Sequence, residues 1–539
     1  MNLKTILLLC FLTINYSNCF GHNAPQQSDS RPLTIVLIMD GLRPDAVTQK
    51  NMPNLFKLQQ EGVEFTNSHA SIPTVTRVNS ASLASGSYPA SHGIMSNSIY
   101  IKEVNPTASV STGNYKNLME VDSVSNGNLL YVKTIGEILQ QNNLKYVAIS
   151  SGSTGSAYLL NHKVHEGVGY LINSQLNNGN DPAIPYNIGE EIIAQFGNPP
   201  TKIDDLSYNT SVDWVENVLY EYVLPKMKPD VIYNWFTEPD HSQHRFGTGS
   251  KEYYKALKNN DRHIELLLTK LKELGLYERV NIIVTSDHGM NEDVQSINLK
   301  ESCKDAGINP DDFIIASSGE TLLLHVKDHD KIKIKRIVEH LQSKHWMGAI
   351  FTEALSETGQ EQELVNPYGF IEGTFSLDLI RANHPERKAD IIFNFHWSSK
   401  GNEYGISGSS FKNTNGKPQK LGEGGGHGNI SPACINNTLI AWGTNFKTGV
   451  KINNPSGIVD ITPTVLNILK INADVTFDGR ILEEALINGI DPQKIIIESK
   501  TYTVQTKDEK YKAAVQISKK DRHWYVDKGW RIYKAKHVE

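Results

Sequence analysis

Cysteine is scarce in this sequence, with 4 residues in 539, and two of them fall within the first twenty positions. A chain with so few cysteines is not a disulfide-stabilised scaffold. Cys303 and Cys434 are the two that remain beyond that first stretch. In an oxidising compartment they either bond to each other or stay as free thiols, and the sequence leaves both alternatives open.

Positive charge is also limited, because 53 Lys and Arg residues stand against 59 Asp and Glu. The formal net charge is −6 and the isoelectric point is about 6.3. This balance provides no general attraction to nucleic acid or to anionic membranes, so we expect no nucleic-acid-binding surface. An anionic substrate has to be held locally, by metal ions or by a few cations.

Long hydrophobic runs are absent after the first twenty residues, so no later segment predicts a membrane-spanning helix. Lys4 and the apolar run Ile6–Ile14 are typical of a secretory signal peptide, with a membrane anchor as the alternative. Cleavage is expected near Cys19, and Asn18 argues against a lipidated Cys19. The sequence predicts a secreted or periplasmic protein without a transmembrane segment after signal removal.

Several short runs of β-branched and apolar residues end in polar residues. They cover residues 33–40, 231–240, 281–289, 389–395 and 437–443. Runs of this kind are typical of strands buried on both faces of a parallel sheet. Helical patterns lie between them, most clearly Asp261–Leu274 with Gly275 as its expected C-cap. The alternation predicts an α/β fold with a doubly wound, mostly parallel sheet, in which ligands lie at the carboxyl ends of the strands.

Three stretches interrupt this alternation. Residues 103–128 and 172–211 are rich in Asn, Ser, Gly and Thr and predict surface loops or a cap insertion. Residues 320–390 contain a further helix around Lys331–Ser343 and are expected to form a subdomain over the site. The alternating segment after Lys494 predicts a peripheral pair of strands. The expected organisation is a signal peptide at 1–20, a catalytic domain at 31–480 with insertions around 103–128, 172–211 and 320–390, and a peripheral segment at 481–539.

Six side chains of metal-ligating type stand at strand ends and in loops: Asp40, Asp240, His244, Asp287, His288 and His427. Singly, each has an ordinary interpretation, since a strand-end Asp often caps the next helix and a histidine in a glycine run is usually a loop residue. Together, three carboxylates and three imidazoles match the ligands that zinc or a similar borderline metal prefers. With one hydroxyl they are sufficient for two ions that clamp a phosphoryl transfer. We therefore expect two divalent metal ions as cofactors, with zinc as the first choice.

Six motifs follow one another between about Leu33 and Ile471: MDGLRPD, PTVTRVN, SHGIMSN, PDHSQH, TSDHG and GGGHG, with GIVDITPTVLNIL after them. In these motifs the chain resembles the type I phosphodiesterase/nucleotide pyrophosphatase family of the alkaline phosphatase superfamily. The resemblance implies an alkaline-phosphatase-like fold and hydrolysis of a small-molecule phosphate ester. It implies these roles: Asp240, His244 and His427 bind one metal ion; Asp40, Asp287, His288 and the hydroxyl of Thr76 bind the other; Thr76 is the nucleophile; Asn97 helps to hold the phosphoryl oxygens.

The chemistry expected of Thr76 is also plausible without the resemblance. A threonine hydroxyl is a poor nucleophile unless a metal ion lowers its pKa. At the start of a helix, backbone N–H groups and the helix dipole favour an anion. A covalent phospho-threonine would then be hydrolysed by water. Thr74 is the alternative nucleophile in the same motif.

Arg77 departs from the family pattern. In nucleotide-cleaving members an aromatic residue follows the nucleophile and stacks on the base, so Arg77 puts nucleotide specificity in question. We interpret Arg77 as substrate-binding, through a phosphate or carboxylate, with a surface salt bridge as the alternative. His92 and His241 are interpreted as structural.

A preference for diesters is predicted from missing cations. Threonine-based monoesterases of the superfamily place a Lys-x-Arg pair after a strand that corresponds to Lys145–Ser150 here. Gly152 and Thr154 occupy those positions in this chain. A monoester dianion needs more preorganised positive charge than a diester does. Arg77 and Lys163 are the candidate cations to replace the pair from elsewhere in the chain.

The leading function is an exported phosphodiesterase or nucleotide pyrophosphatase. A phosphomonoesterase and a phosphotransferase on the same fold are the alternatives, although such transferases usually carry membrane spans. A sulfatase is excluded because a Cys or Ser in C/S-x-P-x-R context is absent. A non-catalytic binding protein would be expected to lose ligands, and none of the six is missing.

Overall fold

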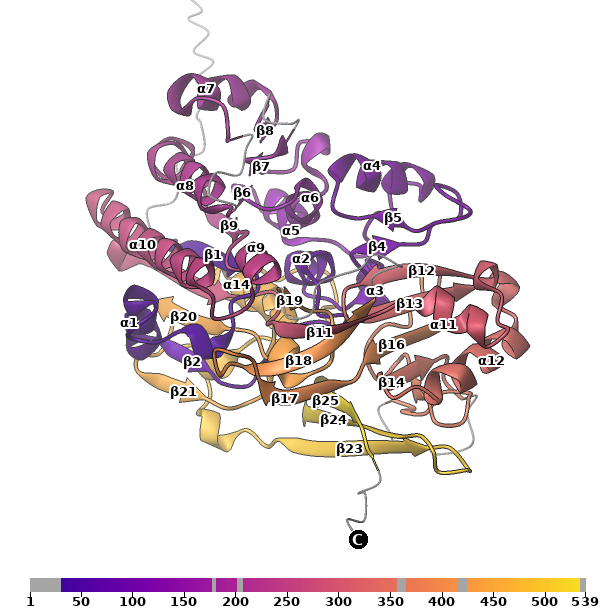
Figure 1. Ribbon diagram of the computed structural model, residues 1–539. Helices are drawn as coiled ribbons and strands as arrows, with labels where there is room; N and C mark the ends of the chain where they lie inside the picture. Colours follow the sequence, from indigo (N-terminus) through magenta and orange to yellow (C-terminus); the bar gives the residue numbers. More distant parts are fainter. Residues whose placement is uncertain (1–30, 177–180, 201–206, 356–364, 414–423, 534–539) are drawn as a thin grey trace, which may run out of the picture. The chain divides into compact units, whose positions relative to one another are not determined.

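A nine-stranded sheet is the central element of the computed structural model (Figure 1). The described residues are 31–176, 181–200, 207–355, 365–413 and 424–533, so the expected signal peptide lies outside them. The strand order is β21 (Val450–Ile452), β2 (Val63–Phe65), β20 (Leu439–Gly443), β10 (Val280–Thr285), β1 (Leu33–Met39), β9 (Val231–Phe236), β6 (Tyr146–Ser150), β7 (Tyr170–Asn173) and β8 (Ala183–Ile184). Strands β10, β1, β9, β6 and β7 are parallel, whereas β20 and β8 run in the opposite direction.

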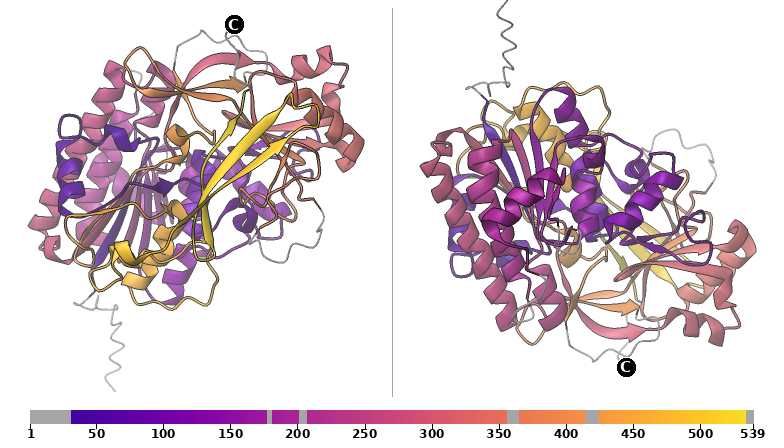
Figure 2. Two further views of the ribbon diagram at one scale, coloured as in Figure 1. Left: turned by 90° about the horizontal axis from the view of Figure 1, so that it is seen from below. Right: turned by 90° about the horizontal axis from the view of Figure 1, so that it is seen from above.

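Helices cover both faces of this sheet (Figure 2), because its central strands are apolar on both sides. In β1, Ile35 and Leu37 belong to one hydrophobic core, and Val36 and Ile38 belong to the other. The first core includes helices α1 (Pro53–Glu61), α8 (Asn209–Val218) and α10 (Lys251–Glu273). The second includes α2 (Thr76–Ser85), α5 (Ile135–Gln141), α6 (Thr154–Leu160) and α14 (Ile461–Ile468). The predicted doubly wound α/β fold is confirmed.

Two smaller sheets lie beside the central one. The five-stranded sheet has the order β12 (Phe313–Ser318), β13 (Thr321–Val326), β16 (Ile391–Phe395), β14 (Met347–Thr352) and β15 (Phe375–Ser376). The four-stranded sheet has the order β17 (Trp397–Gly401), β18 (Ser407–Asn413), β11 (Asn291–Ile297) and β19 (Gly425–Gly426). The run 389–395 therefore forms a strand outside the central sheet, because a pattern that is apolar on both faces does not identify the sheet to which a strand belongs.

The polar stretches contain more regular structure than their composition predicts. Helix α4 (Tyr115–Val124) lies within 103–128, and α7 (Asn187–Phe196) lies within 172–211. At both helices the surface-loop alternative is wrong and the cap-insertion alternative stays a prediction, because Leu118 and Val121 of α4, and Ile192 of α7, are buried. The helix predicted near 331–343 is α12 (Lys331–Gln342). Shorter elements are α3 (Pro89–His92), α9 (Asp240–Phe246), α11 (Leu299–Asp305), α13 (Pro432–Ile435), β3 (Ser68–His69), β4 (Ser98–Ile99), β5 (Val110–Ser111) and β22 (Ser456–Gly457).

The C-terminal segment forms three antiparallel strands instead of the expected pair: β23 (Glu498–Gln505), β24 (Lys512–Lys520) and β25 (His523–Arg531). Figure 2 (left) shows these yellow strands lying across the molecule. The indole of Trp524 donates to the carbonyl of Leu379 at 3.1 Å, and the Tyr511 hydroxyl donates to the carbonyl of Gly348 at 2.6 Å. The segment is therefore packed into the fold and is not peripheral.

Cys303 and Cys434 are buried free thiols, so the disulfide alternative is not realised. Within the described part of the chain, no helix is both long enough and apolar enough to span a membrane.

Candidate active site

Three aspartates meet at the carboxyl ends of adjacent parallel strands. Asp40 directly follows β1, Asp287 follows β10 by one residue, and Asp240 is the first residue of α9, shortly after β9. Strand β1 lies between β10 and β9 in the sheet. The Asp240 N–H donates to the carbonyl of Asp40 at 3.0 Å, and the Gly41 N–H donates to Asp287 Oδ1 at 3.1 Å. These backbone contacts hold the three carboxylates together.

The three predicted histidines approach these carboxylates through Nε2. His244 Nε2 is 3.4 Å and His427 Nε2 is 3.7 Å from Asp240 Oδ1. His288 Nε2 lies 3.1 Å from the Oδ2 atom of Asp287. The rings of His288 and His427 are stacked, with centroids 3.7 Å apart. All six side chains proposed as metal ligands therefore gather at one place.

The structure contains two groups of side chains in which the ligand atoms of each group lie within 4.8 Å of one another. One group is Asp240, His244 and His427, and the other is Asp40, Asp240 and His288. The second group contains Asp240, whereas the sequence predicts Asp287 in this place. Asp240 thus belongs to both groups, while Asp287 Oδ2 is 3.1 Å from Nε2 of His288.

The hydrogen bonds of each histidine determine which ring nitrogen faces the carboxylates. Nδ1 of His427 is 2.9 Å from the carbonyl of Thr74, and Nδ1 of His244 is 2.8 Å from that of Gly425. Nδ1 of His288 is 2.9 Å from the carbonyl of Gly289. A carbonyl only accepts, so we assign the proton to Nδ1 in each ring and a lone pair to Nε2. This is the arrangement by which outer partners orient metal-binding histidines.

Several atoms at the centre of the site have no hydrogen-bond partner among the described residues. They are Asp40 Oδ1, Asp240 Oδ1, Asp287 Oδ2 and His288 Nε2, all buried. Burial, followed by the charges of Asp287 and Asp240, holds the pKa of Asp40 well above its usual range. Buried lone pairs that face one another are costly unless a cation lies between them. The donor set and these unpartnered atoms therefore fit divalent metal ions.

Thr76 is the first residue of α2 and is buried beside this centre. The loop before it is fixed because the Thr74 hydroxyl donates to the carbonyl of Asn429 at 2.8 Å. The Thr74 carbonyl in turn faces His427. These bonds engage the Thr74 side chain in the loop, which favours Thr76 over Thr74 as the nucleophile. Asn97 Oδ1 accepts the Arg77 N–H at 3.1 Å, and so its amide group stands at the N-terminus of α2.

A family model described as type I phosphodiesterase / nucleotide pyrophosphatase matches residues 34–365. The chain belongs to this family. Among known relatives of the family, "Venom phosphodiesterase 2" of Crotalus adamanteus is 30% identical over 275 residues, covering 50% of this chain and 28% of the relative. The bis(5'-adenosyl)-triphosphatase ENPP4 of Bos taurus is 26% identical over 294 residues, covering 54% of this chain and 53% of the relative. The chain thus spans between about a quarter and a half of the length of these relatives.

Solved structures support the fold of this phosphodiesterase family member. Murine ectonucleotide pyrophosphatase/phosphodiesterase 5 superposes with a TM-score of 0.58 at 16% identity, over 85% of this chain and 100% of that chain. A second structure of the same murine protein, an inactive form in complex with AMP, superposes with a TM-score of 0.56 at 15% identity.

Two residues that orient the site were not found by the sequence analysis. The indole N–H of Trp235, in β9, donates to Asp40 Oδ2 at 3.1 Å, which leaves only Oδ1 of that carboxylate without a partner. Glu238 accepts the N–H groups of Tyr208 at 2.8 Å and Ser242 at 3.0 Å and thereby fixes the start of α9. Burial raises the pKa of Glu238 to about 7. The signal in the sequence was the position of both residues just before a ligand motif, at the end of a buried strand.

The cations considered in the sequence analysis lie in different surroundings. Lys163 pairs with Glu166 at 2.8 Å and donates to the carbonyl of Gly127, so it is engaged elsewhere. The Arg77 guanidinium lies near the aspartates. Burial lowers its pKa, whereas the negative charges of Asp40, Asp240 and Asp287 raise it. Within the described residues, Arg77 forms no ion pair at salt-bridge distance, and its Nε has no partner. The salt-bridge alternative for Arg77 finds no support here.

The two positions after β6 remain without a cation. A Cβ atom on Gly152 would stand 3.3 Å from the ring of Trp235, and the Thr154 hydroxyl accepts the N–H of Tyr115 at 3.2 Å. Of the two histidines interpreted as structural, His92 bonds to Ser82 at 3.0 Å. The other, His241, packs edge-on against Tyr208, and its Nε2 has no partner.

Proposed function

We propose that this protein is a metal-dependent phosphodiesterase of the nucleotide pyrophosphatase type that acts through a phospho-threonine at Thr76. The observation that supports this most directly is the set of unpartnered carboxylate and imidazole atoms beside the start of α2. The chemistry named for the relatives agrees with it, since they include a venom phosphodiesterase and a bis(5'-adenosyl)-triphosphatase.

Two divalent ions, zinc by ligand preference, are the cofactors we propose. One would be held by Asp240, His244 and His427, and the other by Asp40, Asp287, His288 and the hydroxyl of Thr76. When bound, such ions supply positive charge that stabilises the developing charge on the reacting oxygens and lowers the pKa of a coordinated hydroxyl.

The protein side chains supply the nucleophile and position the phosphoryl group. The Thr76 oxygen bonds to phosphorus, the bond from phosphorus to the leaving alcohol breaks, and the proton lost by Thr76 is balanced by the one that the leaving oxygen gains. A water oxygen then bonds to phosphorus, the bond to Thr76 breaks, and the proton lost by the water is balanced by the one that returns to the Thr76 oxygen. The Asn97 amide and the free N–H groups at the start of α2 would hold the phosphoryl oxygens. Trp235 and Glu238 keep Asp40 and α9 in place.

A preference for diesters follows from the charge near the phosphoryl position. Gly152 and Thr154 contribute no cation, and Lys163 is paired with Glu166. The decisive experiment measures kcat/KM for a p-nitrophenyl monoester and a matched p-nitrophenyl diester, with and without chelator. We expect a diester-to-monoester ratio above one and loss of at least about a hundredfold in activity on chelation. A ratio below one would favour the phosphomonoesterase, and activity that ignores strong chelators would contradict the metal-dependent mechanism. Transfer of the phosphoryl group to an added alcohol in place of water would favour the phosphotransferase.

Export is part of the proposal because of Lys4 and the apolar run Ile6–Ile14. Mass spectrometry of the mature protein should find a chain that begins near residue 20. A mature chain that still carries Met1 would contradict export by signal cleavage.

A further inference from the structure

Arg77 directly follows the proposed nucleophile in α2, and in the part of the chain that the structure describes its guanidinium has no carboxylate partner at salt-bridge distance. Its backbone N–H is held by Asn97 at 3.1 Å, whereas its Nε is buried and unpartnered. The carboxylates that act on its charge are Asp40, Asp240 and Asp287, which are the proposed metal ligands. A half-buried guanidinium whose buried Nε has no partner among the described residues is costly, so its place here calls for a ligand or another explanation.

Gly113 provides the space in which this guanidinium lies. A Cβ atom at Gly113 would stand 2.8 Å from Arg77 Nη2 and 3.5 Å from its Cζ. The backbone of Gly113 is not in the left-handed region, so a side chain at this position would not strain the backbone but would require the Arg77 guanidinium to shift. Thr112 donates through N–H and hydroxyl to the carbonyl of Asn97 at 3.1 and 2.8 Å, and the Gly155 N–H donates to the carbonyl of Gly113 at 3.1 Å. The guanidinium therefore packs against a fixed loop.

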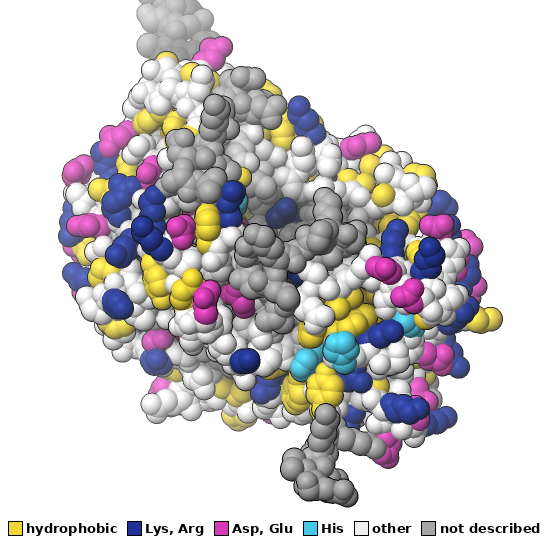
Figure 3. All heavy atoms as spheres, viewed as in Figure 1, with side chains coloured by type: hydrophobic (Ala, Val, Ile, Leu, Met, Phe, Trp, Pro, Cys, Tyr) yellow, Lys and Arg dark blue, Asp and Glu magenta, His cyan; other side chains and the backbone are white. Residues whose placement is uncertain are grey.

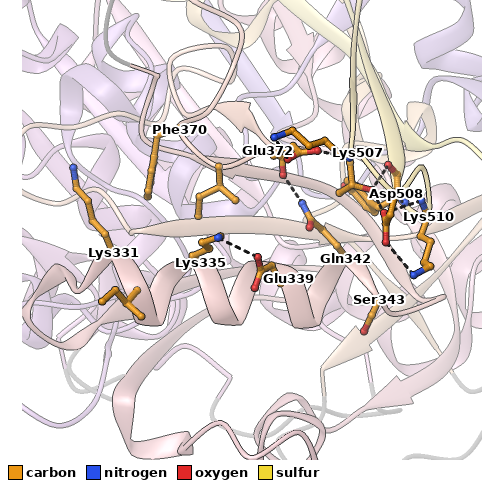
Figure 4. Close-up of a pocket in the computed structure, with 14 residues that line it drawn as sticks. Lys331, Lys335, Glu339, Gln342, Ser343, Phe370, Glu372, Lys507, Asp508 and Lys510 are labelled. Atoms are coloured by element: carbon orange, nitrogen blue, oxygen red, sulfur yellow. Dashed lines mark hydrogen bonds and ion pairs between the residues drawn. The ribbon is translucent and has the colours of Figure 1, made fainter.

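Lysines elsewhere in the molecule show the contrast. A cavity of about 940 Å³ lies between α12 and the β23–β24 turn, and it is lined by several lysines (Figure 4). Lys335 is 3.6 Å from Glu339, and Lys510 is 3.1 Å from Asp508. On the face seen in Figure 3, cationic and anionic side chains are likewise interspersed. Among the described residues Arg77 thus differs from these lysines, because it forms no ion pair at salt-bridge distance.

A charge count in the proposed active site indicates what Arg77 faces. Three carboxylates contribute −3, two divalent ions would contribute +4, and Arg77 contributes +1, which leaves +2. As long as Thr76 keeps its proton, a phosphodiester group, which carries a single negative charge, compensates only half of this. A planar guanidinium is suited to bidentate binding of a carboxylate or phosphate.

We propose that Arg77, held against Gly113, is a specificity residue that binds a second anionic group, a carboxylate or phosphate, on the substituent next to the scissile phosphodiester. This inference rests on the proposed phosphodiesterase function. It assigns the enzyme to diesters that carry an additional negative charge, and not to diesters whose substituent is recognised by aromatic stacking.

The test uses two p-nitrophenyl diesters of equal size, one with glycolate and one with glycolamide as the second alcohol. Wild-type enzyme should prefer the carboxylate over the carboxamide on the order of tenfold or more in kcat/KM. Arg77→Met should reduce this ratio to about one, and Arg77→Lys should restore part of it. Binding is measured separately by calorimetry, in which 2-phosphoglycolate should bind the wild-type protein more tightly than phosphoglycolamide, and Arg77→Met should abolish the difference.

Gly113→Ala is the second variant because it displaces the guanidinium without removing it. Gly113→Ala should lower the ratio of kcat/KM for the glycolate diester over the glycolamide diester toward the Arg77→Met value. The double variant Gly113→Ala/Arg77→Met should show no further decrease in this ratio. Lys163→Met, which removes a paired cation, is the matched control and should leave the ratio unchanged. If neither diester is hydrolysed, the proposed function fails. If both are hydrolysed equally, or if a thymidine diester is preferred to both, the function stands and the inference on Arg77 is wrong. A preference for p-nitrophenyl monoester that depends on Arg77 would also overturn it, because Arg77 would then contact the scissile phosphoryl group itself.

Discussion

Asp460 and Asp40 are both buried carboxylates, and they differ in what surrounds them. Asp460 Oδ1 accepts the N–H of Arg480 at 2.8 Å, and its Oδ2 accepts the Tyr525 hydroxyl at 2.8 Å and the N–H of Gly457 at 2.8 Å. The Arg480 guanidinium in turn binds both oxygens of Glu484, at 2.9 and 2.6 Å. In this structural cluster the carboxylate oxygens all have donors, and Arg480 Nε is the unpartnered atom.

Around Asp40 the neighbours are further carboxylates and the lone pairs of imidazoles. Burial raises the pKa of both Asp40 and Asp460, but Arg480 opposes the rise at Asp460, whereas Asp287 and Asp240 add to it at Asp40. A folded protein tolerates such an arrangement when a ligand supplies the missing charge. The difference between the two clusters thus separates a carboxylate used for stability from one retained for chemistry.

The cluster around Asp40 is called the uncompensated cluster below, because its carboxylates face further carboxylates and the lone pairs of imidazoles. The largest effect should come from removing the proposed nucleophile beside it. Thr76→Ala should lower kcat on the order of 10³-fold or more, because no other group at the start of α2 offers an equivalent oxygen. Metal content, measured by mass spectrometry, should stay close to that of the wild type, since Thr76 is one of seven proposed ligands. Thr76→Ser should keep measurable turnover.

Thr74→Ala is the matched control for this prediction. The Thr74 hydroxyl donates to Asn429 and lies in the loop that precedes α2. We expect its loss to reduce activity by less than about tenfold, as for a neutral hydrogen bond outside the reaction. The opposite result, with an inactive Thr74→Ala and an active Thr76→Ala, would assign the nucleophile to Thr74.

The uncompensated cluster around Asp40 can be predicted from the sequence, whereas the cluster of Asp460, Arg480 and Glu484 cannot. Asp40, Asp240 and Asp287 stand at the ends of recognisable strands, so the fold class and the rule for parallel sheets bring them together. Asp460 lies in the segment GIVDITPTVLNIL and Arg480 follows twenty positions later, and only packing shows that they share a cluster.

Contacts between distant segments account for the other differences. Trp235 and Gly113 serve side chains far from them in sequence, and no local periodicity reveals that role. Helices α4 and α7 were missed because polar composition predicts loops, while a few buried apolar residues per turn are sufficient for a helix in tertiary context.

A second prediction compares the stability contributions of the two clusters directly. Glu484→Gln removes the charge that pairs with buried Arg480 and should lower the free energy of unfolding by about 3–5 kcal/mol. In metal-free protein, Asp40→Asn removes one of three mutually repelling carboxylates and should be neutral or stabilising. An Asn side chain can still accept the Trp235 N–H, so this bond is retained.

Denaturant unfolding in the presence of chelator measures both variants under one condition. If Asp40→Asn destabilised the metal-free protein as much as Glu484→Gln does, the two clusters would be energetically alike. The distinction drawn from their hydrogen bonds would then fail. With metal bound, Asp40→Asn should instead lower the free energy of unfolding, because the substitution then removes a metal ligand.

The smallest effect concerns buried histidines outside both clusters, and it depends on pH. Burial lowers the pKa of His162 to about 3, and burial lowers the pKa values of His325 and His384 to about 4. In the unfolded chain each has a pKa near 6.5. Below about pH 6.5 the unfolded state therefore binds more protons than the folded state, so stability is fully present above that pH and falls as the pH decreases toward 4.

Each such histidine should contribute a slope of up to about 1.4 kcal/mol per pH unit in this window. His162→Gln should reduce the slope of the free energy of unfolding against pH by the contribution of one histidine. The difference between variant and wild type cancels the contribution of every other titrating group, including the active-site carboxylates. His345→Gln, at an exposed position, is the control and should leave the profile unchanged. Unfolding midpoints of chelated protein from pH 7 to 4.5 provide the measurement. An unchanged slope in His162→Gln would mean that His162 binds its proton over the same pH range in the folded and unfolded states, in which case its surroundings would have to stabilise the charged ring, as those of Asp460 stabilise a carboxylate.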